Sequence, residues 1–384
     1  MNHLDKLISQ YCPNGVPFVR LGDGICIYTG EQLNRTFMLS KGIYPVVNGG
    51  IEASGFINKY NEEAQTITMS QGGASAGFVN FQNTRFWAGA HCYVIKPIDN
   101  NKIDNRYLFY YLKQMQFKLQ QNQQGAGIPS VGRSLVHNMS IPLPPLPVQQ
   151  EIVRILDSMT DLIANLDSEI ATRQQQYAHY RDQLLTFGNN VPRKTLGEVG
   201  ILIRGNGLQK KDFCKSGVGC IHYGQIYTQF GMFADKTISF VEPKLAEKLT
   251  KVNTGDIIMA TTGENVEDIC KAVCWLGKES IVSGAHAVVY KHHQNPKYIA
   301  YCLHTQDFYA QKTHYAYGAK VIDIRTDKLA SITIPLPPLS VQQKIVAKLD
   351  AFESLLATLR RECTLRQQQY EYYRERLLSF KETK

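Results

Sequence analysis

The sequence predicts an α+β fold in which two mixed α/β domains are separated by two long helices that form an antiparallel coiled coil, with a pseudo-twofold internal duplication. Three observations predict it. A stretch of 47 residues occurs twice without a gap, its apolar positions follow heptad spacing, and the two remaining long segments share short motifs in the same order. A chain of 384 residues suits two domains with connecting structure better than a single core.

The repeat consists of residues 141–187 and 334–380, which align at an offset of 193 with 27 of 47 positions identical. Each copy opens with a proline cluster, which cannot continue a helix, so the chain enters each copy in an extended conformation. A helix is expected to follow at once. Pro147 suits the first helical turn of the first copy, and Ser340 with Gln343 forms a capping-box pattern in the second.

Apolar residues then recur at alternating steps of four and three over about five heptads, which is typical of a coiled coil. The predicted seam consists of Ile152, Leu156, Met159, Ile163, Leu166, Ile170 and Tyr177 in the first copy and Ile345, Leu349, Phe352, Leu356, Leu359 and Tyr370 in the second. The alternative is that each helix packs only on its own domain. At a rise of roughly 1.5 Å per residue, however, about 40 residues span about 60 Å, more than one small domain needs.

Arg173 and Arg366 interrupt the seam at equivalent places, and each is followed by Gln-Gln-Gln-Tyr. A polar residue in a seam can set the register or face a further partner, and it can also be a solvated defect. The sequence leaves these alternatives open.

The distribution of charge favours pairing of the two copies with each other. Residues 141–187 carry 3 basic and 6 acidic side chains, a net −3, whereas residues 334–384 carry 9 and 6, a net +3. Because a whole domain lies between them, an antiparallel intramolecular pair is the natural topology. The long segments 1–140 (12 basic, 8 acidic) and 188–333 (18 basic, 13 acidic) have net charges of +4 and +5. Basic surface favours a polyanionic partner through counterion release.

The two long segments resemble each other in sequence. Gly89-Ala90-His91 in the first matches Gly284-Ala285-His286 in the second, and each segment shows short alternating strands, glycine turns and one helix near its end, predicted at 107–121 and 297–311. The predicted domain organisation is an N-terminal segment at 1–14 that completes the helical region, a first domain at 15–140, a helical spacer at 141–188, a second domain at 189–333 and a second spacer at 334–384.

Polar loops that contain glycine are the candidate contact surfaces, because Gln, Asn, Arg, Lys and Ser side chains pair with base edges and phosphates. These loops lie at 48–50, 70–75 and 125–133 in the first domain and at 222–225, 261–264 and 317–325 in the second. The candidate DNA-binding residues are Asn48, Ser70, Gln71, Ser75, Arg85, Ser130, Arg133, His222, Tyr223, Gln225, Thr261, Thr262, Lys320 and Arg325. We interpret His91 and His286 as structural histidines.

Motifs of catalysis are missing from the sequence. It contains no Asn-Pro-Pro-aromatic or Asp-Pro-Pro-Tyr methyltransferase motif and no phosphate-binding G-x-x-x-x-G-K-[ST] loop. Asp235 followed by Glu242-Pro243-Lys244 loosely mimics a metal-dependent nuclease pattern, but this spacing is permissive. No catalytic residue is therefore predicted.

The nine cysteines form no C-x-x-C pair, which indicates free thiols in a reducing compartment and no metal site. There is neither a secretory signal nor an apolar stretch of roughly 18 residues, so we expect a cytoplasmic protein without a membrane span.

The proline-rich entry and the helix ending in Arg-x-x-Gln-Tyr-x-x-Tyr-Arg-x-x-Leu-Leu-x-Phe, at 173–187 and 366–380, together with duplication around two variable domains, resemble the specificity subunit of type I restriction–modification systems. The resemblance covers essentially the whole chain. Residues 4–16 also resemble the short N-terminal piece of that family, which helps to close the protein into a pseudo-circular shape.

The resemblance implies that each domain is a target recognition domain that reads one half of a bipartite double-stranded DNA site. It implies that the helices set the gap and dock two modification (methyltransferase) subunits, which restriction subunits can join. This chain would hold no cofactor, and S-adenosylmethionine, ATP and Mg²⁺ would belong to the partner subunits. Two other functions stay open at this point, a self-contained DNA methyltransferase or nuclease and a coiled-coil scaffold that does not bind DNA.

Overall fold

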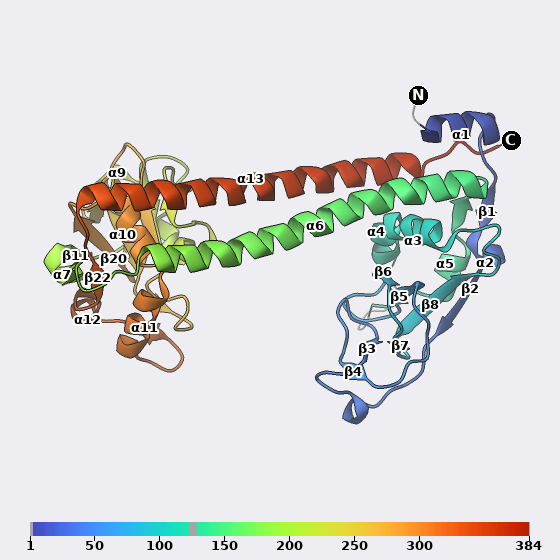
Figure 1. Ribbon diagram of the computed structural model, residues 1–384, viewed down its shortest axis with the longest axis horizontal. Coiled ribbons are helices and arrows are strands. Elements are labelled where there is room, and N and C mark those ends of the chain that lie inside the picture. Colours follow the sequence, from blue (N-terminus) through green and yellow to red (C-terminus); the bar gives the residue numbers. More distant parts are fainter. Residues whose placement is uncertain (1–2, 123–128, 384) are drawn as a thin grey trace. The chain divides into compact units, whose positions relative to one another are not determined.

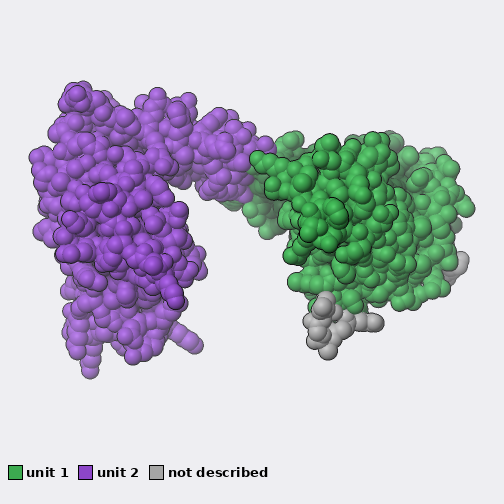
Figure 2. Space-filling view, turned by 90° about the horizontal axis from the view of Figure 1, so that it is seen from below, with its two compact units in different colours: residues 1–167, 361–384 green, residues 168–360 purple. Residues whose placement is uncertain are grey.

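The computed structural model describes residues 3–122 and 129–383, which form two compact units (Figure 2). Unit 1 comprises Met1–Asp167 with Arg361–Lys384, and unit 2 comprises Ser168–Arg360. Each unit contains one α/β domain, a part of each long helix and a hydrophobic core of its own.

The elements of unit 1 follow one another along the chain as Figure 1 labels them. The helices are α1 (His3–Tyr11), α2 (Leu21–Gly24), the 3-10 helix η1 (Arg35–Phe37), α3 (Asn105–Gln114), α4 (Gln116–Gln121), α5 (Arg133–His137), the first part of α6 (Leu146–Leu184) and the last part of α13 (Leu339–Leu377). The strands are β1 (Phe18–Arg20), β2 (Ile25–Thr29), β3 (Tyr44–Val47), β4 (Phe56–Ile57), β5 (Thr66–Ser70), β6 (Val79–Gln82), β7 (Trp87–Ala88), β8 (Cys92–Pro97) and β9 (Ser140–Pro142).

The main sheet of unit 1 has the order β2-β8-β5-β6 with antiparallel neighbours. A smaller sheet, β4-β3-β7, and the ribbon β1-β9 complete the domain. Every residue of β5 is buried, which is the pattern of a strand covered on both faces. Helix α3 packs against β5, β6 and β8, and it begins where the Asp104 side chain accepts hydrogen bonds from the backbone of Arg106 and Tyr107.

Unit 2 repeats this framework with a larger second sheet. Its helices are the rest of α6, α7 (Leu196–Val199), the 3-10 helix η2 (Lys210–Asp212), α8 (Tyr223–Thr228), α9 (Pro243–Ala246), α10 (Pro296–Cys302), α11 (Gln306–Tyr315), α12 (Thr326–Ala330) and the first part of α13. Its strands are β10 (Arg193–Thr195), β11 (Gly200–Arg204), β12 (Val218–Ile221), β13 (Phe233–Ala234), β14 (Ser239–Val241), β15 (Thr250–Val252), β16 (Ile257–Ala260), β17 (Thr262–Gly263), β18 (Ala272–Trp275), β19 (Ile281–Ser283), β20 (Ala287–His292), β21 (Ile322–Asp323) and β22 (Thr333–Pro335).

The main sheet of unit 2 has the order β11-β20-β16-β18-β13, so its first four strands correspond to β2-β8-β5-β6. A second sheet, β14-β12-β19-β15, and the ribbons β10-β22 and β17-β21 accompany it. The prediction of a mixed α+β fold with internal duplication is therefore confirmed for the two domains.

The single helix predicted near the end of each domain is wrong, because each is two helices. In unit 1, α3 and α4 meet at Met115. In unit 2 the Thr305 side chain accepts a hydrogen bond from the backbone of Phe308 and starts α11 as a separate helix. A threonine in an otherwise apolar and aromatic run is a weak signal, so the boundary was missed.

The first turn of each long helix contains a fully buried glutamine, whose hydrogen bonds hold the helix to its domain. The Gln149 side chain donates to the carbonyls of Lys102 and Pro144 and accepts from the backbone N–H of Asp104. Its counterpart Gln342 donates to the carbonyl of Pro337 and the side chain of Gln294, and it accepts from the backbone of Asn295.

About two turns further along, an aspartate of each helix contacts the domain again. Asp157 accepts a hydrogen bond from the Tyr110 hydroxyl and forms an ion pair with Arg106. Asp350, at the equivalent position, accepts from the Tyr301 hydroxyl at 2.7 Å and from the Lys297 ammonium at 2.7 Å. The repeated sequence therefore carries repeated attachment points as well as a repeated seam.

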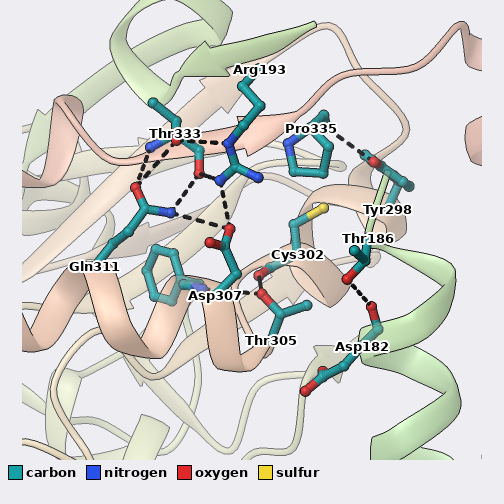
Figure 3. A network of polar contacts seen from close by, with 11 residues as sticks. Asp182, Thr186, Arg193, Tyr298, Cys302, Thr305, Asp307, Gln311, Thr333 and Pro335 are labelled. Carbon is teal, nitrogen blue, oxygen red and sulfur yellow. Dashed lines mark hydrogen bonds and ion pairs between the residues drawn. The ribbon is translucent and has the colours of Figure 1, made fainter. Parts of the chain in front are cut away.

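In unit 2 the ribbon that leads into α13 is further fixed by Arg193 (Figure 3). Its guanidinium donates to the carbonyl of Thr333 at 2.9 Å and forms an ion pair with Asp307 at 2.6 Å. Gln311 bonds the same aspartate and the same threonine. This network joins β10, β22 and α11, so the two strands that flank the domain are held to its helical layer.

The two long helices pair antiparallel within each unit. In unit 1 Asp157 lies near Tyr370 and Asp167 accepts a hydrogen bond from the Cys363 thiol at 3.2 Å. In unit 2 the Tyr177 and Tyr180 rings lie 6.4 and 5.5 Å from the ring of Phe352. As the chain advances along α6 in unit 1, its partner on α13 moves back, which confirms the predicted antiparallel coiled coil.

The predicted seam is buried unevenly. Its members next to the domains are buried, namely Ile152, Leu156, Tyr177, Ile345, Leu349 and Leu356. The others are half-buried, namely Met159, Ile163, Leu166, Ile170, Phe352, Leu359 and Tyr370. Two helices alone cover only one flank of each seam residue, so burial is fuller where a domain core adds a second layer.

The two chain ends meet in unit 1 (Figure 1). The backbone N–H of Val16 donates to the carbonyl of Lys381 at 2.9 Å, and that of Thr383 donates to Val16 at 3.0 Å. Leu4 of α1 is buried in the same core as Leu378. Residues 4–16 thus contact the C-terminal end of the chain within unit 1.

Candidate nucleic-acid interface

Polar side chains of unit 1 gather where β2 and β5 end and β8 begins. We call this group the unit 1 loop cluster; it consists of Asn48, Gln71, His91, Ser130 and Arg133. The Asn48 side chain accepts a hydrogen bond from the backbone of His91 at 3.0 Å, and the backbone of Gln71 donates to the carbonyl of His91 at 2.9 Å. Three chain segments are thereby fixed around one histidine.

One further segment, residues 130–133, reaches the same end of the sheet. The loop after α4 joins through a bridge between Gly72 and Ser130 and through the backbone of Val131, which donates to Gln71. The Arg133 guanidinium lies 5.6 Å from the centre of the Tyr93 ring, with an exposed side chain. The unit 1 loop cluster thus combines amide, imidazole, hydroxyl and guanidinium groups, which are the groups that read base edges and bind phosphates.

In unit 2 the corresponding sheet end carries the unit 2 loop cluster, which consists of Tyr223, Thr262, His286 and Asp323. The Thr262 hydroxyl donates to the Asp323 carboxylate at 2.9 Å and lies 3.2 Å from Nδ1 of His286. The Tyr223 ring packs 5.1 Å from the His286 ring. This arrangement places an imidazole, a hydroxyl and a carboxylate together at the sheet end.

The backbone that supports the two clusters is equivalent. The backbone N–H of Thr261 donates to the carbonyl of His286, and the backbone N–H of Gln71 donates in the same way to the carbonyl of His91. Ile324 donates to Thr261, and the β17-β21 pair joins Thr262 to Asp323, at the place of the Gly72–Ser130 bridge. The same loops therefore converge in both domains, while the side chains on them differ.

Several predicted residues lie in the interior. Ser70, Thr261 and His222 are only 4%, 3% and 6% exposed. The His222 ring accepts a hydrogen bond from the backbone N–H of Gly224, and burial, together with the nearby Lys210 and His286, lowers the pKa of its imidazole. These three positions support the loops and do not favour direct contact with a ligand.

Other predicted residues have partners inside the fold or lie elsewhere. Gln225 accepts from the backbone of His222 and donates to Ser239, and both contacts hold α8 in place. Arg85 is exposed, but it lies in the turn between β6 and β7, where it pairs with Glu63 at 2.8 Å. The unit 1 loop cluster does not include it.

The remaining predicted residues are accessible. Ser75 is half-buried in the turn after β5, Lys320 is exposed in the loop before β21, and Arg325 is exposed and paired with Asp327 at 3.0 Å. Residues 125–128 of the predicted loop 125–133 lie outside the described residues. DNA contact by each predicted residue stays a prediction.

The two clusters also contain His91, His286 and Asp323, which are not among the candidates that the sequence gives. The two histidines share the Gly-Ala-His motif, and their interpretation as structural residues stays a prediction. Asp323 gave no signal, because an acidic residue next to Lys320 and Arg325 resembles an ordinary charged loop. Only the strand pairing of β17 with β21 places it beside Thr262.

Among residues 3–122 and 129–383, no three His, Cys, Asp or Glu side chains are arranged to hold a metal ion. Each helix in this part of the chain is too short or too polar to cross a bilayer.

Comparison with known proteins identifies the family. The profile of the type I restriction modification DNA specificity domain matches the chain twice, at residues 13–172 and 190–364. The chain belongs to this family. Each match covers one loop cluster and the first part of one long helix.

Individual relatives agree with the family assignment. A Haemophilus influenzae protein provisionally named a type I restriction enzyme specificity subunit is 30% identical, over 85% of both chains. An Escherichia coli type I restriction enzyme specificity subunit is 27% identical, over 99% of this chain and 97% of its own length. The crystal structure of a type I system S subunit from Mycoplasma genitalium has the same fold, with a TM-score of 0.61, 16% identity and coverage of 95% and 96%.

Proposed function

We propose that this specificity subunit is a non-catalytic, cytoplasmic component of a type I restriction–modification complex. Each domain reads one half of a bipartite double-stranded DNA target, and the paired helices set the unread gap between the halves. The observation that carries the proposal is the duplicated loop cluster. The same backbone loops, with different side chains, stand at the same sheet end of both units, as two readers of two different half-sites require.

The basic character of both domains supports DNA as the ligand. The two domain segments together hold 30 basic side chains (12 + 18) against 21 acidic ones (8 + 13). Neutralised phosphates release counterions, so binding should weaken steeply as salt rises. Half-sites read by two similar domains on one face of B-DNA should be centred about one helical turn, roughly 10 base pairs, apart.

The paired helices have features suited to docking two modification subunits. In unit 1 a groove beside the seam is lined by Met159 and Leu162 of α6 and by Arg366, Gln369 and Tyr373 of α13. In unit 2 an equivalent groove is lined by residues at the repeat-related positions, namely Arg173, Gln176, Tyr180 and Phe352. Two equivalent grooves match two copies of one partner.

The interrupting arginines are satisfied within their own helices. Arg173 bonds Glu169 at 2.7 Å and Gln176 at 2.9 Å, and Arg366 bonds Glu362 at 3.3 Å and Gln369 at 3.1 Å. Each therefore forms a preorganised polar edge beside apolar residues, which favours the partner-facing role among the alternatives. The chain itself needs no cofactor in this proposal; S-adenosylmethionine, ATP and Mg²⁺ act on the modification and restriction subunits.

Methylome sequencing of cells with and without this gene tests the function. We expect a split motif with an unread gap that is methylated only when the gene is present. A continuous motif, or methylation that does not depend on the gene, would contradict the proposal.

Two assays with purified protein separate this function from other classes. The chain alone should transfer no methyl group from labelled S-adenosylmethionine and should not cut DNA in Mg²⁺. Together with its modification partner it should shift DNA in a salt-dependent manner. Activity of the chain alone would indicate a self-contained enzyme, and the absence of a shift would indicate a scaffold that does not bind DNA.

A further inference from the structure

We infer that His286 is a specificity-determining residue that reads the amino group of an adenine or cytosine in the half-site bound by unit 2, and that Thr262 and Asp323 act as positioning residues that hold its ring in one tautomer. The inference rests on the proposed DNA-reading function and adds the chemistry of one contact.

The backbone places His286 at the open end of the sheet. It occupies the turn immediately before β20, with an exposed side chain and a φ of 65°. A positive φ is uncommon in a residue other than glycine. The turn is held by the hydrogen bond from the backbone of Thr261 to the carbonyl of His286, and the imidazole packs against the Tyr223 ring. The ring therefore has a defined position although it is exposed.

The hydrogen bonds determine which ring nitrogen carries the proton. The Thr262 hydroxyl has one hydrogen, which it donates to Oδ2 of Asp323, because a carboxylate can only accept. The hydroxyl oxygen can then only accept from Nδ1 of His286, 3.2 Å away. Nδ1 therefore bears the hydrogen, and in the neutral ring Nε2 is left as an acceptor.

A fixed acceptor selects among base edges. In the major groove adenine presents the N6 amino group and cytosine the N4 amino group as donors, whereas guanine and thymine present acceptors at the corresponding places. Nε2 of His286 can accept from an amino group and has no hydrogen for an acceptor. One position of the half-site read by unit 2 should accordingly be adenine or cytosine.

We call the chain of hydrogen bonds from Asp323 through Thr262 to His286 the relay. Unit 1 cannot build the same relay. His91 stands at the equivalent turn, but Gly72 occupies the place of Thr262 and carries no hydroxyl. The Asn48 side chain holds the backbone of His91 and not its ring. Position 91 therefore serves as an internal comparison for position 286.

The test uses the full chain in complex with its modification subunits and a pool of duplexes with randomised half-sites. For His286→Ala we expect the preference at one position of one half-site to fall on the order of tenfold or more, with the other positions unchanged. Thr262→Val, which removes the hydroxyl, should lose the same preference, and Thr262→Ser, which keeps it, should retain it. His91→Ala should leave that half-site unaffected.

The outcomes separate the inference from the proposed function. A wild-type complex without any sequence preference would overturn both. A normal wild-type preference that survives His286→Ala, or a uniform loss of affinity across all sequences, would overturn the inference alone. Retention of the preference in Thr262→Val would overturn the relay. Because the His286 side chain is exposed, thermal unfolding should show that His286→Ala is still folded, and Thr262→Ser provides the folded comparison for Thr262→Val.

Discussion

Gln149 and Gln342 are fully buried polar side chains at equivalent positions of the two long helices. Each forms three hydrogen bonds within its own unit. We expect Gln149→Leu to lower the free energy of unfolding of unit 1 by about 2–4 kcal/mol, because buried backbone groups without partners are costly. Urea unfolding measures this loss.

The same helix offers a matched control. Gln150 is adjacent to Gln149 and exposed, so Gln150→Leu should change stability by less than roughly 0.5 kcal/mol. Equal effects of the two substitutions would show that the buried hydrogen bonds contribute little.

Two half-buried histidines, His292 and His304, make the stability of unit 2 depend on pH. Burial lowers the pKa of both His292 and His304 to about 4. The folded protein keeps these rings neutral, whereas the unfolded chain, with a pKa of about 6.5, takes up protons as the pH falls. The free energy of unfolding of unit 2 should therefore decrease between about pH 6.5 and pH 4, and these two rings add no further change below that window.

The chain has two tryptophans, Trp87 in unit 1 and Trp275 in unit 2. In a Trp87→Phe background, the fluorescence of Trp275 reports unfolding of unit 2 alone. Adding His292→Asn and His304→Gln should flatten the pH dependence in that window. Parallel curves for the parent and the variant would contradict the assignment, whatever the absolute stabilities.

At the scale of elements, the sequence predicted what its own periodicity encodes. Heptad spacing predicted the two long helices and their seam, because a local pattern repeats along most of each 39-residue helix. Local patterns could not predict the strand order β2-β8-β5-β6, since these pairings join residues far apart in the chain. The contact between Thr262 and Asp323 depends on such a pairing, which is why the second loop cluster could be predicted only in part.

The grooves beside the seam predict how partner binding can be lost without loss of the fold. The Arg366 side chain is half-buried and lines the groove of unit 1. Its guanidinium bonds Glu362 and Gln369 of its own helix. Arg366→Glu should therefore weaken binding of the modification subunit on the order of tenfold or more, with unfolding of unit 1 changed by less than about 1 kcal/mol. Titration of the labelled subunit measures the affinity.

Arg361→Glu is the control, because Arg361 is exposed on the same helix and does not line the groove. It makes the same change of charge and should leave the affinity nearly unaltered. Equal weakening by both substitutions would indicate long-range electrostatics, and no weakening by Arg366→Glu would remove this groove as the docking site.

At the scale of the whole molecule, the contact between the two chain ends explains how one continuous sequence can start both domains in the same way. In unit 2 the N–H of Val191 bonds the carbonyl of Gly188, and the chain runs without interruption from α6 into β10. In unit 1 Val16 makes the matching bond to Lys381, across the two ends of the chain. A non-covalent contact thus replaces a peptide connection, and both domains receive the same support from the paired helices.

If the paired helices set the gap, their length must be readable in the DNA target. Removing one facing heptad from both α6 and α13 keeps the seam in phase and shortens the pair by about 10 Å, at roughly 1.5 Å per residue. With base pairs stacked about 3.4 Å apart, the unread gap should become shorter by up to about three base pairs, while both half-site sequences stay the same. Methylome sequencing of cells that carry the shortened chain measures both quantities. Removing the heptad from one helix only should abolish methylation, because the facing seams no longer match. A shortened chain that still methylates the original gap would refute the role of the helices as a ruler and leave the reading domains as the proposal has them.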